Sequence, residues 1–373
     1  MRTPAEVFAP GDFISEELEA RGWSQVELAE IMLRPARLIS ELVAGKRAIT
    51  PETAKGLGAA FGTGPEFWMN LERDYLLARA VHDDAAVQRR AHLYEMAPIK
   101  EMAKRKWIEP SDNVAVLETR VQKFFQVDDL GETLSLPHAA RKSGSSTGKV
   151  EVNSSLRAWL LRVKQIANAI SVPAYSMAGL QAALSTLETL MVSPEEVRHV
   201  PAVLSNCGVR LVIVEKLPQA KIDGACFWLN DESPVVGMSI RRDTIDNFWF
   251  VLRHELEHVL RGDGKNDCIL DDLEGQNAGD GEELPSEERI ANVAASEYCA
   301  PRLESFMARK HPFYYERDVL AFSQTISRHP GIVVGQMQFR LQQYAYLTKH
   351  LAKIRNSLLP ASIYDGWGQV PSI

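Results

Sequence analysis

Residues 253–262 read Arg253-His254-Glu255-Leu256-Glu257-His258-Val259-Leu260-Arg261-Gly262 and contain the pattern H-E-x-x-H. Apolar residues recur at helical spacing from Thr244 to Arg261, and Gly262 is a residue type that commonly ends helices. Side chains four residues apart on a helix stand one turn above each other, so His254 and His258 can hold one metal ion. Glu255 points to the flank of this pair, where it can take a proton from water beside the metal. The stretch therefore predicts a helix that carries a metal centre.

A pattern this short also arises by chance, as a charged helix with two histidines on its surface. The two interpretations differ in whether a third ligand follows. Residues 287–301 have the composition of a second helix, with small residues such as Ala291 and Ala295 that allow close approach to the first. Glu288 would supply the third ligand, and Asn292, one turn later, could hydrogen-bond the other ring nitrogen of a ligand histidine. Three protein ligands leave a fourth position for water, which is typical of a catalytic zinc.

The two motifs together resemble those of the ImmA/IrrE metallopeptidases, bacterial zinc enzymes that cleave helix-turn-helix repressors. The resemblance runs from about Cys207 to Pro301 and continues more weakly to about Tyr344. It implies a Zn²⁺ ion, with His254, His258 and Glu288 as its ligands and Glu255 as the catalytic glutamate.

The chain departs from this family pattern at three places. Glu257 stands where a small residue is usual, Ala294 stands where Phe is usual, and Tyr298-Cys299-Ala300 replaces Leu-Leu-Met. None of these positions is a predicted ligand, so the departures concern packing and substrate preference.

Length and composition restrict the number of domains and the class of protein. The chain has 373 residues, 45% of them hydrophobic, which is enough for two or three globular domains. No apolar run reaches the roughly 18 residues of a membrane span, and the N-terminus lacks the apolar core of a signal peptide, so we expect a cytoplasmic protein. The four cysteines form no C-x-x-C, which disfavours disulfides and a cysteine zinc site. A net charge of −7 disfavours a chain that wraps nucleic acid over its whole surface, but it allows a small local footprint.

Residues 10–80 predict a helix-turn-helix. A helix from Asp12 to Arg21 is followed by a second that starts with Ser24 as N-cap and Glu27 three residues later, a capping box. After a short turn, Pro35 opens a further helix that runs to Val43. Between residues 34 and 55 there are five basic and two acidic residues, whereas residues 1–80 hold nine basic and twelve acidic ones. The basic footprint is therefore local, as expected for a recognition helix, although a plain helical bundle with solvated arginines has the same periodicity.

This segment is similar to the HigA antitoxins of the XRE-type helix-turn-helix group. The resemblance rests on Ser24-Gln25-x-x-Leu28-Ala29, on the stretch from Ile39-Ser40-Glu41 to Thr53-Ala54, and on Gly62 to Leu71. It implies operator binding as a homodimer and repression of the chain's own promoter. Arg34 departs from the Ser-type residue usual before the recognition helix. The DNA contacts that we expect come from Gln25, Arg34, Arg37, Ser40, Lys46 and Arg47.

The remaining segments carry weaker signals. The basic stretch 88–106 is either a solvated face or an additional phosphate contact, and residues 142–148 have the composition of an exposed loop. Three short runs, 209–214, 224–229 and 235–240, predict a small sheet whose last strand we expect to be an edge that pairs with an extended peptide.

The loop 263–288 has ten acidic residues and one lysine, which indicates a solvated loop, a gate or a calcium site, although the spacing of an EF-hand is absent. Two roles of His329 remain open, as a structural histidine in a turn and as a group that stabilises the transition state.

The sequence thus predicts an α-rich α+β chain in three parts. They are an all-α helix-turn-helix bundle over 1–80, a helical connector and linker over 81–150, and a zincin-like domain with a small β-sheet and the H-E-x-x-H helix over 151–373. We expect a DNA-binding transcriptional regulator whose zinc-dependent endopeptidase domain cleaves a repressor or itself, with operator DNA and a repressor or toxin protein as partners. The alternative is a non-catalytic antitoxin or repressor whose peptidase-like domain only binds metal or a partner.

Overall fold

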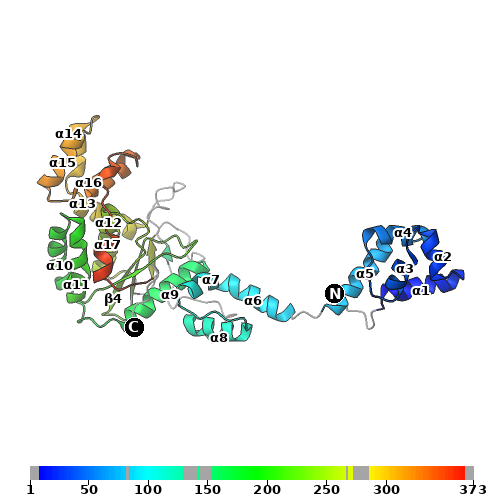
Figure 1. Ribbon diagram of the computed structural model, residues 1–373. Coiled ribbons are helices and arrows are strands. Elements are labelled where there is room, and N and C mark those ends of the chain that lie inside the picture. Colours follow the sequence, from blue (N-terminus) through cyan, green and yellow to red (C-terminus); the bar gives the residue numbers. More distant parts are fainter. Residues whose placement is uncertain are drawn as a thin grey trace. The chain divides into compact units, whose positions relative to one another are not determined.

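The computed structural model describes residues 8–80, 84–128, 141–142, 153–265, 268–271 and 285–365. The chain divides into two compact units, Met1–Val87 and Gln88–Ile373 (Figure 1). We describe each unit by itself.

The first unit is all-helical where it is described. Its helices are α1 (Pro10–Arg21), α2 (Gln25–Ile31), α3 (Ala36–Val43), α4 (Pro51–Phe61) and α5 (Pro65–Arg79). They enclose one apolar core, which contains Ile14, Leu28, Ile39, Leu57 and Trp68. Burial of these side chains from every helix holds the short α2 and α3 in place, since helices of seven or eight residues are marginal on their own.

Local signals in this unit act as predicted, with small shifts at the boundaries. The capping box is present, because the Ser24 side chain accepts from the Glu27 N–H and the Glu27 carboxylate accepts from the Ser24 N–H at 2.7 Å. Gly22 ends α1 in the left-handed conformation, with φ of 69°. The helix α1 begins at Pro10 rather than Asp12, and Pro35 is the N-cap of α3 rather than its first helical residue.

The second unit is built on a mixed six-stranded sheet. Its strands, as described, are β1 (Arg141–Lys142), β2 (Arg210–Val214), β3 (Gly224–Trp228), β4 (Pro234–Met238), β5 (Ile269–Asp271) and β6 (Tyr364–Asp365), in the order β1-β5-β3-β4-β2-β6. β3 runs antiparallel to β4 and β5, whereas β2 runs parallel to β4 and β6, and β1 parallel to β5.

The prediction of an edge strand at 235–240 was wrong. β4 lies between β3 and β2 and is hydrogen-bonded on both sides, so its backbone has no free side for a peptide. The reason is that β2 pairs with β4 in parallel, so β4 lies between the two other predicted strands, and β5, β1 and β6 extend the sheet beyond them.

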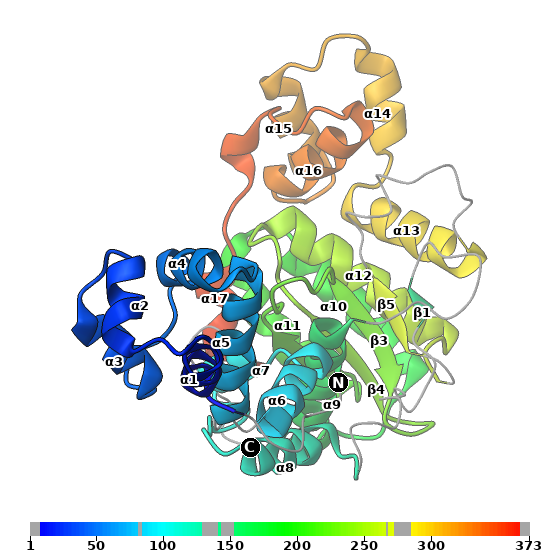
Figure 2. The same ribbon diagram turned by 90° about the vertical axis from the view of Figure 1, so that its right-hand side faces the viewer.

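Helices cover both faces of this sheet (Figure 2). The helical elements of the second unit and its entry are α6 (Asp84–Met96), α7 (Ile99–Lys104), α8 (Val114–Phe125), α9 (Ser154–Ala169), α10 (Met177–Leu190), η1 (Pro194–His199), α11 (Val200–Asn206), α12 (Ile245–Arg261), α13 (Ser286–Cys299), α14 (Leu303–Lys310), α15 (Glu316–Thr325), α16 (Pro330–Leu341), η3 (Thr348–His350), α17 (Arg355–Leu358) and η4 (Leu359–Ala361).

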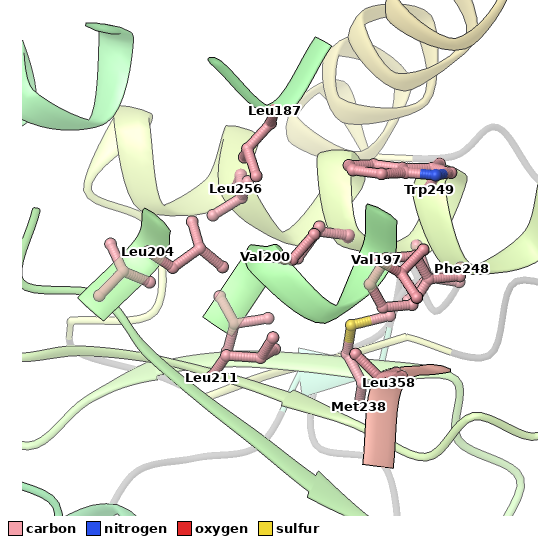
Figure 3. Packing of buried hydrophobic residues seen from close by; sticks show 14 of the residues in the cluster. Leu187, Val197, Val200, Leu204, Leu211, Met238, Phe248, Trp249, Leu256 and Leu358 are labelled. Carbon is pink, nitrogen blue, oxygen red and sulfur yellow. The ribbon is translucent and has the colours of Figure 1, made fainter. Parts of the chain in front are cut away.

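Alternate residues of the strands point into two different cores. Val212 and Phe227 belong to a cluster with side chains of α6 to α9, whereas Leu211 and Met238 belong to a cluster with α10, α11 and α12. Figure 3 shows the second cluster, in which Leu256 of α12 lies among side chains of α10 and α11. The chain of the second unit is therefore organised in layers, with α12 on one face of the sheet.

The helices that we assigned to a connector over 81–150 are part of this unit. Leu93 of α6, Met102 of α7 and Val121 of α8 are buried in the same core as Trp159 of α9. This packing explains why the second unit begins at Gln88, since separating these helices would expose a shared apolar core.

The helix predicted over Thr244–Arg261 is α12, with Thr244 as its N-cap. Gly262 ends it in the left-handed conformation, with φ of 72°. α12 contacts β3 and β4 with one side, and α13 and α16 with others. His329 is the N-cap of α16, where its Nδ1 accepts from the Gly331 N–H, which is a structural turn role. Across the described ranges, no helix has both the length and the apolar character that a membrane crossing requires.

Candidate metal centre and nucleic-acid interface

Four buried side chains from three elements converge in the second unit. They are His254 and His258 of α12, Asp271 of β5 and Glu288 of α13. The two histidines and Asp271 are fully buried, and Glu288 is 3% exposed. One potential ligand atom from each lies within 4.8 Å of those of the other three. The structure therefore brings together the three predicted ligands and adds a fourth.

Most of the distances between these atoms are near the edges of a tetrahedral metal site, and the distance between His258 and Asp271 is longer. Nε2 of His254 lies 3.2 Å from Nε2 of His258, 3.2 Å from Oδ2 of Asp271 and 3.4 Å from Oε2 of Glu288. Nε2 of His258 lies 4.0 Å from Oδ2 of Asp271 and 3.6 Å from Oε1 of Glu288. Ligands about 2.0–2.1 Å from a zinc ion in tetrahedral geometry are separated by about 3.3 Å.

Packing of the two helices places the ligands. Ala291 and Ala295 of α13 are fully buried, and α13 packs closely along α12. Small side chains at these positions allow the short separation that Glu288 needs to reach the histidines. β5 is fixed by β3, because Asp271 pairs with Gly224 and its carbonyl accepts from the Asp223 N–H at 2.7 Å.

The donor set fits a divalent cation. Both oxygens of Asp271, and Oε2 of Glu288, are buried without a hydrogen-bond partner in the described part of the chain. Carboxylates left in this state cost several kcal/mol. Burial alone would lower the pKa of His254, but the adjacent Asp271 and Glu288 carboxylates outweigh it and raise that pKa to about 10. A cation held by two imidazoles and two carboxylates would balance these charges.

Glu255 is fully buried in a space that Gly224 leaves open. A Cβ atom on Gly224 would overlap Oε1 of Glu255, so the glycine makes room for this carboxyl group. Burial raises the pKa of Glu255 well above its usual range, and the nearby carboxylates of Asp271 and Glu288 raise it further. The Glu255 carboxyl group lies beside that of Asp271, and neither of its oxygens makes a hydrogen bond of good geometry within the described ranges.

Asp263 contacts the ring nitrogen of His258 that faces away from the cluster of candidate ligands. Its Oδ2 lies 3.1 Å from Nδ1 of His258, the arrangement that orients ligand histidines in metal sites. Asn292 is half-buried one turn after Glu288, and its role as an outer partner stays a prediction.

Sequence reasoning missed Asp263 and Asp271 because both lie in the acidic stretch 263–288. One signal was available for Asp271. It ends the short apolar run Cys268-Ile269-Leu270, which is the pattern of a buried strand.

The six residues expected to contact DNA are all exposed on the first unit. Gln25 begins α2, Arg34 lies in the turn before α3, Arg37 and Ser40 are on α3, and Lys46 and Arg47 follow α3. Glu41 pairs with both Arg37, at 2.8 Å, and Arg47, at 3.1 Å, and Arg34 pairs with Glu52. These surface pairs are weak, so phosphates can replace the carboxylates at little cost.

The fold of the first unit and the comparisons with known proteins agree on its class. The sequence pattern of the helix-turn-helix family matches residues 14–68. An uncharacterized HTH-type transcriptional regulator of Escherichia coli K12, YddM, is 39% identical over 71 residues, which cover 19% of this chain and 76% of the relative. The chain therefore belongs to the HTH-type transcriptional regulators.

A solved structure is also similar to a part of the chain. It is an addiction module antidote protein of the HigA family from Coxiella burnetii, 35% identical, with a TM-score of 0.20, over 20% of this chain and 84% of that protein.

Proposed function

We propose that this regulator binds operator DNA as a homodimer through its first unit, and that its second unit is a zincin-like zinc endopeptidase of the ImmA/IrrE type. The observation that carries the peptidase proposal is the buried convergence of His254, His258 and Glu288 beside Glu255. The pattern H-E-x-x-H on a surface helix would leave both histidines exposed, whereas here both are fully buried.

The side chains of the centre have distinct tasks in this proposal. Zinc, when bound, supplies a Lewis acid that polarises a carbonyl and makes water more acidic. Glu255 takes the proton of the attacking water and donates it to the leaving amine. Its buried position suits this task, because a carboxyl group with a raised pKa holds a proton long enough to pass it on. Asp263 keeps the His258 ring in its orientation.

The proposed substrate is a helix-turn-helix repressor, or this chain at the loop 142–150, which lies within the second unit. Lys142 lies in β1, paired with Leu270 of β5, and residues 143–150 lie outside the described residues. A cut there would leave α6, α7 and α8 on the fragment that carries the helix-turn-helix. These helices share a core with α9, so relief of repression by a self-cut also requires this core to separate.

The second candidate function is a metal-binding repressor without peptidase activity. Asp271 favours it, because this carboxylate lies where the water of a catalytic zinc would bind.

Intact mass measurement separates the two candidates. Purified protein is incubated with zinc, alone and with repressors encoded beside its gene, and Glu255→Gln is the control. A fragment that requires both zinc and Glu255 is expected. Absence of such a fragment with every repressor tested leaves the metal-binding repressor as the function.

A further inference from the structure

We propose that Asp271 is a fourth protein ligand of the metal, so that the resting centre is closed to water and opens only when this carboxylate leaves. The inference rests on the proposed metal site, and it adds a regulatory state to that site. Three observations on Asp271 carry it.

The first observation is position. Oδ2 of Asp271 lies 3.2 Å from Nε2 of His254, which is closer than the 3.4 Å to Oε2 of Glu288. If the two histidines and Glu288 held an ion, the Asp271 carboxylate would be the remaining protein group able to bind it.

The second observation is burial. The Asp271 side chain is fully buried, and the groups beside it are the ring of His254 and the carboxyl groups of Glu255 and Glu288, none of which makes a hydrogen bond of good geometry to its oxygens. A buried carboxylate beside two others is costly unless a cation offsets its charge. Direct binding to the metal offsets that cost most. The two histidines, Asp271 and Glu288 then make a neutral site with a divalent ion.

The third observation is the anchoring of the backbone. Asp271 pairs with Gly224 of β3, and its carbonyl accepts from the Asp223 N–H. The strand therefore holds Asp271 at the site, while rotation about its side-chain bonds can free the fourth position without breaking the ladder. The closed state thus differs from the open state by one side chain.

The test uses the full-length protein with cobalt(II) in place of zinc and thiocyanate as the probe of an open position. Wild type should bind one cobalt, and its visible absorption spectrum should not change when thiocyanate is added. Asp271→Ala and the isosteric Asp271→Asn should bind cobalt at least about tenfold more weakly, and their spectra should shift with thiocyanate. Asp263→Ala is the matched control, because it removes the outer contact to His258 and also weakens cobalt binding, yet its spectrum should not respond to thiocyanate.

The outcomes separate the inference from the proposed function. A wild-type spectrum that shifts with thiocyanate as the Asp271 variants do overturns the fourth ligand and leaves the three-ligand zinc centre standing. Wild type that binds neither cobalt nor zinc overturns both. Thermal unfolding of each variant shows whether it has folded. If neither Asp271 variant folds, the wild-type response to thiocyanate decides alone.

Discussion

At the scale of single residues, the metal centre depends on a few atoms that the backbone brings within bonding range of one ion. Glu288 is the predicted ligand with the most direct test. Replacing it by Ala removes one of four ligands, so we expect clearly less zinc per chain at equal total metal. Glu287→Ala is the matched control, because the neighbouring carboxylate is not in the cluster and should leave the zinc content unchanged. Equal zinc in the two variants would remove Glu288 from the site.

Zinc binding should release protons near neutral pH. In the metal-free chain the pKa of His254 is raised to about 10, so the ring carries a proton at pH 7, and it must lose that proton to bind metal. We expect at least about one proton released per zinc at pH 7, declining as the pH passes about 10. Calorimetry in buffers of different ionisation enthalpy measures this number. Binding heats that do not depend on the buffer would show that His254 is already neutral.

Gly224 offers a way to disturb Glu255 without touching a ligand. In Gly224→Ala the added Cβ would overlap Oε1 of Glu255, so the carboxyl group must move. We expect metal-dependent cleavage to fall by at least about a hundredfold, as for loss of a general base, while zinc content stays near one per chain. Unchanged cleavage in this variant would mean that Glu255 works from a different position.

At the scale of elements, a helix or strand could be predicted when residues within it determine its structure, and could not be predicted when pairing with a distant segment does. The helix over Thr244–Arg261 was confirmed because its period, its cap and Gly262 are all local signals. β5 was missed because its short apolar run lies inside an acidic stretch, and pairing with β3, a segment distant in the chain, stabilises it. The position of β4 could not be predicted from its own residues, because it depends on parallel pairing with β2, which β3 separates from β4 along the chain. The convergence of His254, His258 and Glu288 could therefore be predicted from spacing along helices, whereas the position of Asp271 beside them depends on the sheet.

Around α3, ion pairs set the charge available for DNA. Glu41 pairs with both Arg37 and Arg47, so Glu41→Gln should raise the affinity for DNA a few-fold at low salt. Glu17→Gln, which affects the pair with Arg21 on α1, is the control and should change the affinity less. Titrations with labelled operator DNA measure both. An equal effect of the two variants would place the DNA elsewhere on the unit.

The opposite change should weaken binding. Arg37→Ala with Lys46→Ala removes two exposed charges, and each lost phosphate contact lowers the slope of log affinity against log salt by about one. We expect weaker binding and a flatter slope. Identical slopes for this variant and wild type would exclude both residues from the footprint.

At the scale of the whole molecule, the proposed DNA binding and the proposed metal chemistry belong to separate units of one chain. The helix-turn-helix belongs to the first unit, and His254, His258, Asp271 and Glu288 belong to the second. Because no DNA-contact residue lies in the metal centre, Glu255→Gln should bind operator DNA with the affinity of wild type. Its regulation would change only through the loss of cleavage.

The central claim is that the second unit holds one zinc ion in the buried cluster, and metal analysis of the purified chain tests it most directly. We expect one zinc per chain in wild type, and little zinc in a variant in which His254 and His258 are both Ala but which still binds operator DNA. Wild type without zinc after exposure to the metal, or a double variant that keeps a full equivalent, would contradict the claim.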